Sequence, residues 1–197
     1  MDRRKALKNL GLSLGLVVAT PAVMSLLQSC KNDGNKMAVW NPEFFSKDEG
    51  IVVENLVDLI LPPTGNIPGA KDVNVAKFLD LHASKVLDEQ SQDYYKKGLE
   101  AMLNTFGKPV RELKTDDYDA LLAKFLKASS EEREAFRKDE NDNLVLNRLE
   151  SLRGTAIWAY KTSEKVGEEV LVYDPIPGEQ KGCISVEEAT GGRAWSL

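Results

Sequence analysis

The chain has 197 residues, a formal net charge of −5, 42% hydrophobic and 29% charged residues, two cysteines and one histidine. This length favours one ordinary domain with enough apolar residues for a core, and the acidic balance argues against a nucleic-acid binder. One histidine and two distant cysteines exclude the usual Cys/His zinc modules and argue against an intramolecular disulfide framework.

Residues 1–29 have the layout of an export signal. A basic head that contains the adjacent Arg3 and Arg4 precedes an apolar stretch from Leu10 to Leu27. This order is typical of a secretory signal. The adjacent arginines resemble the twin-arginine signal, which a receptor of the export machinery reads as an address and which suits folded cargo. We therefore expect an exported protein on the periplasmic side of a membrane.

The apolar stretch ends in Leu26-Leu27-Gln28-Ser29-Cys30. A leucine, a small residue and then a cysteine resemble a bacterial lipoprotein cleavage box, so we expect lipidation at Cys30 and a lipid anchor on the membrane surface. The alternative is an uncleaved membrane anchor, although about 17 apolar residues are marginal for a span. Residues 30–43 are expected to form a tether.

Helical periodicity dominates from residue 44 onward. Ser46 and Glu49 form a capping box at the start of the first expected helix, and Pro62-Pro63 ends it. Strand-type alternation is scarce. The expected helices cover about residues 47–61, 73–88, 92–106 and 142–161, with one more beginning at a Thr115 cap and a short charged one beginning at residues 129–132. We predict a mainly α, small helical bundle-like domain over residues 44–197, with an extended, turn-rich C-terminal tail from about residue 166.

The tail differs in kind from the helices. It is rich in turn residues, yet it keeps large apolar side chains. Such a segment either wraps its own helical domain or lies on another protein, which would order it on binding. The tail residues that we expect at a partner contact are Tyr173, Pro175, Pro177, Cys183 and Trp195.

Cys183 stays unpaired if Cys30 is lipidated. In an oxidising compartment an unpaired cysteine suggests a bridge between chains or a free thiol. Three interpretations are open: a plain buried thiol, a contact with a partner that includes an interchain disulfide, and a reactive thiol.

Side-chain groups for catalysis are scarce. His82 shares a helical face with Val86 and other apolar residues, where a lone histidine is most often a core or rim residue. Asp116, Asp117 and Asp119 resemble a cation site, but the helical pattern assigns them to a first turn and a solvated surface. The sequence has no phosphate-binding loop, dinucleotide fingerprint or nucleophile elbow. We therefore expect no catalytic residue, metal site or cofactor in this chain.

Motifs in two regions, together with the twin-arginine start, resemble one known family. The first region carries Leu59-Ile60-Leu61-Pro62-Pro63-Thr64, Pro68-Gly69-Ala70-Lys71 and Val75-Ala76-Lys77-Phe78-Leu79-Asp80, and the tail carries Tyr173-Asp174-Pro175-Ile176-Pro177-Gly178 and Lys181-Gly182-Cys183. They are similar to the motifs of the gluconate 2-dehydrogenase subunit 3 family, and the resemblance covers most of the chain from about Phe44.

The resemblance implies a small, non-catalytic subunit of membrane-associated dehydrogenases that oxidise sugars, sugar acids or alcohols. In such complexes a large subunit holds the flavin, expected to be FAD, and a cytochrome c subunit often passes electrons onward. The small subunit carries the export signal and escorts the large one. The cleavage box at Cys30 departs from this pattern, because it would give the small subunit a lipid anchor of its own.

Two functions therefore compete. The first is an accessory and escort subunit that contacts its partner through the Pro62–Ala70 turn and the tail from Tyr173 to Trp195. The second is a stand-alone surface lipoprotein, acting as an enzyme or a ligand-binding module that uses His82 with nearby carboxylates. The motifs and the lack of a recognisable active site favour the first.

Overall fold

The computed structural model describes residues 40–173, 178 and 182–196. Within these ranges the chain forms helices and no β-strand, which confirms the predicted mainly α fold. The predicted export signal, Arg3, Arg4 and Cys30 lie outside the described residues, as do Pro175 and Pro177. The helices are α2 (Lys47–Ile60), α3 (Val75–Lys85), α4 (Glu89–Phe106), α5 (Thr115–Leu126), α6 (Ser130–Lys138), α7 (Glu140–Lys161) and α8 (Val186–Thr190), with a 3₁₀ turn η1 (Val110–Glu112) and a π-helical turn η2 (Val166–Val170).

Polar side chains fix where the helices begin. At α2 the Ser46 hydroxyl accepts the Glu49 N–H, and the Glu49 carboxylate accepts the Ser46 N–H at 2.6 Å, which is the predicted capping box. The expected Thr115 cap of α5 is wrong by one position. Thr115 is already the first helical residue, and the Asp117 carboxylate closes the helix start by accepting the Lys114 N–H at 2.7 Å.

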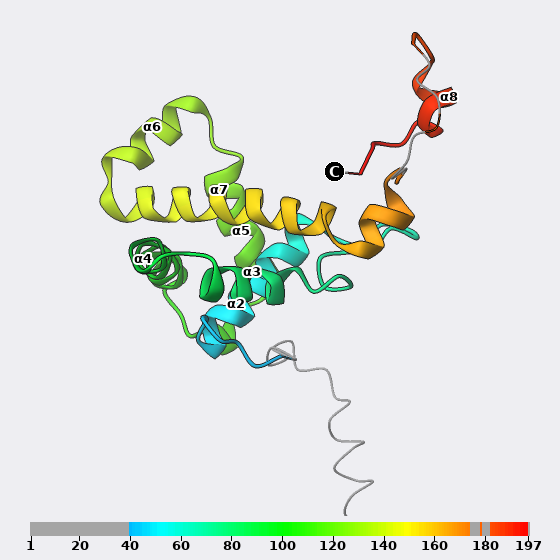
Figure 1. Ribbon diagram of the computed structural model, residues 1–197. Helices are drawn as coiled ribbons and strands as arrows, with labels where there is room; N and C mark the ends of the chain where they lie inside the picture. Colours follow the sequence, from blue (N-terminus) through cyan, green and yellow to red (C-terminus); the bar gives the residue numbers. More distant parts are fainter. Residues whose placement is uncertain (1–39, 174–177, 179–181, 197) are drawn as a thin grey trace, which may run out of the picture. The chain divides into compact units, whose positions relative to one another are not determined.

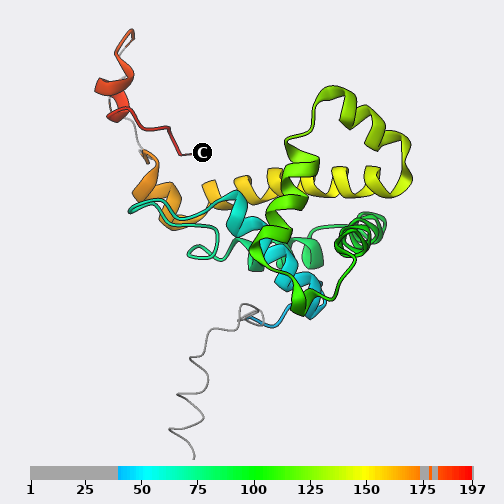
Figure 2. The same ribbon diagram turned by 180° about the vertical axis from the view of Figure 1, so that it is seen from behind.

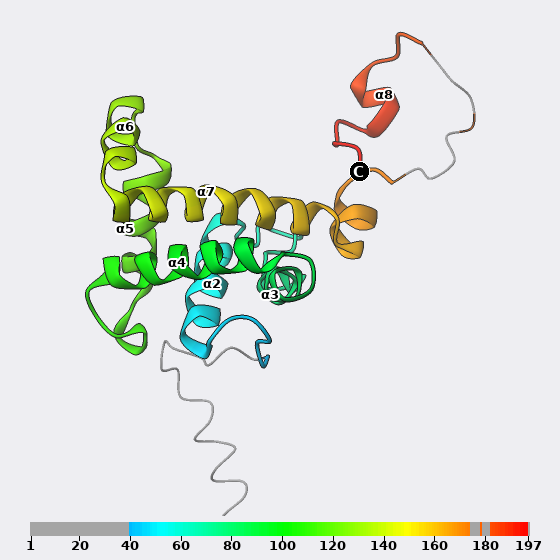
Figure 3. The same cartoon turned by 60° about the vertical axis from the view of Figure 1, so that its left-hand side comes forward.

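The core is organised around α7, which packs against α2, α3, α4, α5 and α6 (Figure 1). Seen from behind, α5 crosses α7 (Figure 2), and α4 runs alongside α7 (Figure 3). The apolar stripe that the sequence predicts along α7 is buried, and Leu146 and Arg148 are buried beside it. That stripe consists of Val145, Leu149, Leu152, Ala156 and Ala159.

Two expectations about local structure are corrected. Val86 follows the end of α3 and is 68% exposed, because the helix ends at Lys85 and the chain turns away from the apolar face. The tail from residue 166 is only partly extended. It begins with the π-helical turn η2, and it contains the one-turn helix α8, which the Ser185 hydroxyl caps by accepting the Glu188 N–H.

Candidate partner-binding surface and adjoining pocket

Three rings from α3 and α7 form an exposed cluster, the α3–α7 aromatic patch, made of Phe78, His82 and Trp158. The ring centroid of Trp158 lies 5.2 Å from that of Phe78 and 5.9 Å from that of His82, both edge-on. Phe78 and Trp158 keep 38% and 45% of their surface exposed, while His82 is half-buried against them. Single exposed apolar residues are ordinary, whereas these rings contact one another across two helices, which makes the patch a candidate binding surface.

The family motif between α2 and α3 is a braced turn. Thr64 and Ile67 exchange backbone hydrogen bonds of 3.0 and 2.9 Å, and Gly65 at the tip has a φ of +57°, a conformation that favours glycine. The Tyr160 hydroxyl of α7 donates to the Pro68 carbonyl at 2.6 Å. This bracing holds the exposed side chain of Ile67 outward, at the segment expected to contact a partner.

A second glycine of this motif is fixed by close packing. A Cβ on Gly69 would lie 2.7 Å from the Pro63 ring, so no larger residue fits without moving the backbone. The Gly69 N–H also donates to the Asp72 carboxylate at 2.7 Å. The motif residues Pro63 and Gly69 thus determine the shape of the turn.

Val166 at the start of the tail is buried, whereas the large apolar side chains described from Tyr173 onward are exposed. Val172 donates to the Ala194 carbonyl and accepts from Ser196, both at 2.9 Å, so the segment closes on itself beside Trp195. Tyr173 and Trp195 are 55% and 50% exposed. At these two side chains the tail is not covered by its own helical domain, and contact with another protein stays a prediction.

Cys183 is exposed, with a φ of +55°. The interpretation as a plain buried thiol is therefore wrong. Because a cysteine has a Cβ, the left-handed backbone at this position is strained. The contact with a partner and the reactive thiol both stay open.

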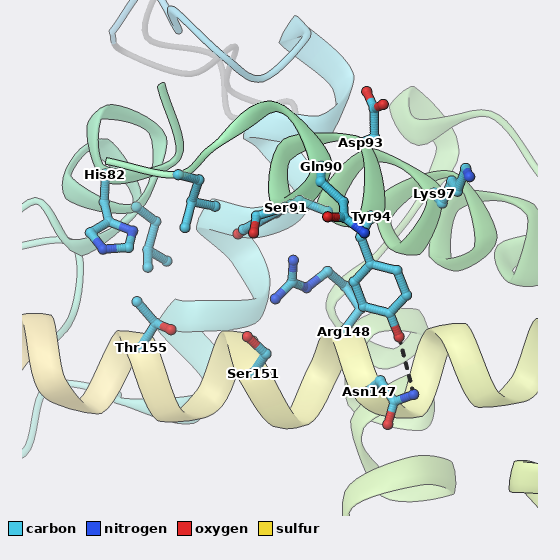
Figure 4. A pocket seen from close by; sticks show the side chains of 13 residues that line it. His82, Gln90, Ser91, Asp93, Tyr94, Lys97, Asn147, Arg148, Ser151 and Thr155 are labelled. Carbon is cyan, nitrogen blue, oxygen red and sulfur yellow. Dashed lines mark hydrogen bonds between the residues drawn. The ribbon is translucent and has the colours of Figure 1, made fainter. Parts of the chain in front are cut away.

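A pocket of about 590 Å³ opens between α3, α4 and α7, and His82 lies on its wall (Figure 4). Sequence reasoning did not find this pocket, because its residues come from three helices that only the packing brings together. The lining residues are Leu79, His82, Leu87, Gln90, Ser91, Asp93, Tyr94, Tyr95, Lys97, Asn147, Arg148, Ser151 and Thr155.

Arg148 is the unusual residue of the pocket. Its side chain is buried, with 7% exposed, and the guanidinium carbon lies 3.6 Å from the centroid of the Tyr95 ring. Burial lowers the pKa of Arg148 from its ordinary value, because a charge in a poorly solvated place is disfavoured. Gly98 on α4 makes room for its stem, since a Cβ there would lie 2.9 Å from the Arg148 Cβ.

Two further classes of site are absent from the described part of the chain. No three His, Cys, Asp or Glu residues of these ranges gather in a way that could hold a metal ion, and Asp116, Asp117 and Asp119 form no such group. None of the described helices combines the length and the apolar character needed to cross a membrane.

The family model of gluconate 2-dehydrogenase subunit 3 matches residues 47–178, about two thirds of the chain. The match includes the braced turn, the α3–α7 aromatic patch and the first residues of the tail. Neither a curated protein nor a solved structure matches the chain. With its helical fold and its motifs in place, the chain belongs to the gluconate 2-dehydrogenase subunit 3 family, a family of dehydrogenase-complex subunits.

Proposed function

We propose that this chain is a non-catalytic accessory subunit that binds the large, flavin-dependent subunit of a dehydrogenase and escorts it during export. The observation that carries the proposal is the α3–α7 aromatic patch, within the family match. Trp and other aromatic side chains dominate the binding energy of interfaces, because they bury much apolar area and lose little conformational entropy. The large subunit is the occupant that family membership supports.

The chemistry of the complex belongs to the partner in this proposal. FAD and the sugar, sugar-acid or alcohol substrate are held by the large subunit, and a cytochrome c subunit takes the electrons. This chain contributes the export signal with Arg3 and Arg4, and a lipid anchor at Cys30 that keeps the complex on the periplasmic side of the membrane. A twin-arginine signal suits this division of labour, because it passes a partner that has already folded around its flavin.

The escort role is tested by expressing the large subunit with and without this chain and measuring where dehydrogenase activity is found. We expect exported activity only when the chain is present. Arg3→Lys with Arg4→Lys should leave the activity inside the cell, and Cys30→Ser should leave an unprocessed, unlipidated precursor. Full export and activity without the chain would overturn the escort role. Substrate oxidation by the isolated chain that His82→Ala abolishes would support the stand-alone enzyme instead.

The binding surface has its own test, which uses co-purification of the two subunits. Trp158→Ala should weaken the complex by about 2 kcal/mol, or roughly 30-fold in Kd, if Trp158 is a central anchor of the interface. Ile157 is the matched control, since it directly precedes Trp158 on α7, has similar exposure, and projects about 100° away around the helix. Equal losses for Trp158→Ala and Ile157→Ala would show that the aromatic patch is not the anchor.

A further inference from the structure

His82 contacts both exposed rings of the α3–α7 aromatic patch. Its imidazole stacks on the Phe78 ring, with the centroids 6.1 Å apart and 23° between the ring planes, and it meets the Trp158 ring edge-on at 5.9 Å. His82 is also the single histidine of the chain. Histidine is the side chain that ordinarily changes its charge between pH 5 and 8. The patch therefore combines two apolar rings with a group of the type that gains a charge near neutral pH.

The part of the chain that the structure describes provides no counter-ion to His82. The imidazole forms no ion pair with any described carboxylate. Asp80, the carboxylate of α3, is buried and accepts three backbone N–H groups instead. The half-buried imidazole extends from α3 toward α7 on the pocket wall, where water reaches it (Figure 4). In the free chain, protonated His82 is thus stabilised by water and by a cation–π interaction with its ring neighbours.

The other charged groups around His82 do not replace a counter-ion. On α3 itself, Lys85 follows His82 by about one turn and pairs with Glu43 at 2.5 Å. The described lining of the pocket contains no residue of α2, and its charged members are Asp93 and Lys97 of α4 and Arg148 of α7. These three leave one net positive charge, which offers no compensation to a further cation in the same place.

An apolar partner that covers the patch changes this balance. The partner removes water from the imidazole, and burying an unpaired charge costs free energy. A neutral imidazole carries no such cost, so it joins Phe78 and Trp158 as part of a continuous ring surface. Binding therefore favours the neutral form of His82. By linkage, protonation of His82 in turn weakens binding.

We propose that His82 makes the binding of the large subunit depend on pH, with a tight complex when His82 is neutral and a weaker one when it is protonated. The inference rests on the proposed function, because it concerns the regulation of the same patch. Its sign follows from the uncompensated charge: affinity is highest at the alkaline end of the histidine range and falls as pH decreases. Acidification then loosens the complex, and neutralisation restores it by removing one proton.

The test measures the Kd between the full chain, purified in detergent, and the large subunit at about pH 7.5 and about pH 5.5. The large subunit has titratable groups of its own, so the comparison is with His82→Gln, whose amide stays neutral. We expect the unchanged chain to lose about tenfold more affinity on acidification than His82→Gln, the effect of one proton taken up by an ordinary histidine. His82→Lys keeps a charge throughout, and it should bind at least tenfold more weakly than His82→Gln at both pH values.

Proton release supplies a readout that a merely structural role of His82 would not move. Calorimetric titration in two buffers of different ionisation enthalpy counts the protons released when the subunits bind. Near pH 6 the unchanged chain should release more protons than His82→Gln, by up to one per complex. Ile157→His in the His82→Gln chain is the control, because Ile157 is exposed on α7 outside the patch. This variant should not restore the proton release.

The outcomes separate this inference from the proposed function. Binding with the same pH response in the unchanged chain and in His82→Gln leaves the binding surface intact and overturns the role of His82. A complex of the unchanged chain that tightens in acid relative to His82→Gln shows that the partner offers a carboxylate to His82, which reverses the proposed sign and overturns it. Absence of proton release by the unchanged chain overturns it without any variant. Absence of binding at every pH overturns the proposed function and this inference together.

Discussion

The buried carboxylate of Asp80 accepts the backbone N–H of Phe45 at 2.8 Å. The same carboxylate also accepts the N–H groups of Glu43 and Phe44, at 2.7 and 3.0 Å, so one side chain of α3 holds three consecutive residues ahead of α2. Phe45 is thereby placed with its ring centroid 5.7 Å from that of Tyr95. Asp80 thus defines where the chain enters the helical domain.

Asp80→Ala should lower the free energy of unfolding by about 2–4 kcal/mol, because it leaves three N–H groups without an acceptor and opens a cavity. Urea denaturation measures the loss. Asp119→Ala is the control, since Asp119 is exposed on α5, and it should change stability by less than about 0.5 kcal/mol. Similar values for the two variants would contradict the anchoring role of Asp80.

Gly98→Ala and Gly154→Ala form a matched pair of helical glycines with opposite expected effects. A Cβ at Gly98 would lie 2.9 Å from Arg148, so the variant should lose about 1–3 kcal/mol of stability. A Cβ at Gly154 meets nothing within 4 Å, and Gly154→Ala should gain up to about 1 kcal/mol from helix propensity. Thermal and urea unfolding of both variants measures these changes in stability. A Gly98→Ala protein as stable as the unchanged chain would show that α4 and α7 can move apart freely.

Tyr160→Phe removes the hydroxyl that donates to the Pro68 carbonyl. We expect a loss of about 0.5–1.5 kcal/mol and faster proteolysis between Pro62 and Ile67, because the turn is no longer tied to α7. Limited proteolysis with mass spectrometry checks the cleavage site. Tyr94→Phe, at an exposed tyrosine of α4, should leave the cleavage pattern unchanged.

The free energy of unfolding should decrease at acid pH, because three carboxylates at helix starts become protonated. Backbone N–H groups that hydrogen-bond the carboxylates lower the pKa of Asp88 and of Glu132, and the Lys108 ammonium lowers the pKa of Asp117. Because the pKa of these carboxylates is lower in the folded protein, they take up protons at a higher pH in the unfolded chain than in the folded protein. The stabilisation is therefore complete above the ordinary values, 3.8 for Asp and 4.5 for Glu, and is lost as pH drops through the lower folded values.

The pH effect is measured as the urea midpoint across acid pH. Glu132→Gln should remove part of the decline without changing the buried core, because Glu132 is exposed on α6. A midpoint that stays constant as pH falls from about 6 to about 3 would contradict the contribution of these caps.

Cys183 should react readily with a maleimide in the native chain, because its thiol is exposed. Cys183→Ser should abolish the labelling once Cys30 is lipidated. In the assembled complex we expect a higher-mass band on non-reducing electrophoresis that reductant and Cys183→Ser both remove. Subunits that run separately without reductant would exclude the covalent bridge, and labelling that persists in the complex would place Cys183 outside the interface.

The sequence alone determined the helical class and most helix positions, because helices depend on local spacing and local caps. Ser46 and Glu49 predict the start of α2, and the stripe from Val145 to Ala159 predicts the buried face of α7. The sequence also indicated the family, because the motif of the braced turn consists of a few residues that lie close together in the chain. The η2 turn was missed because residues 166–170 have no strong helical period.

Tertiary structure alone decided which polar side chains became buried. Asp80 and Arg148 look like ordinary surface charges in a helical pattern, and the sequence does not state which neighbours will cover them. The segment ahead of α2 gives Asp80 three N–H partners, and the packing of α4 against α7 buries the Arg148 Nε without a hydrogen-bond partner. Burial depends on contacts between distant segments, so the environments of Asp80 and Arg148 could be recognised only in three dimensions.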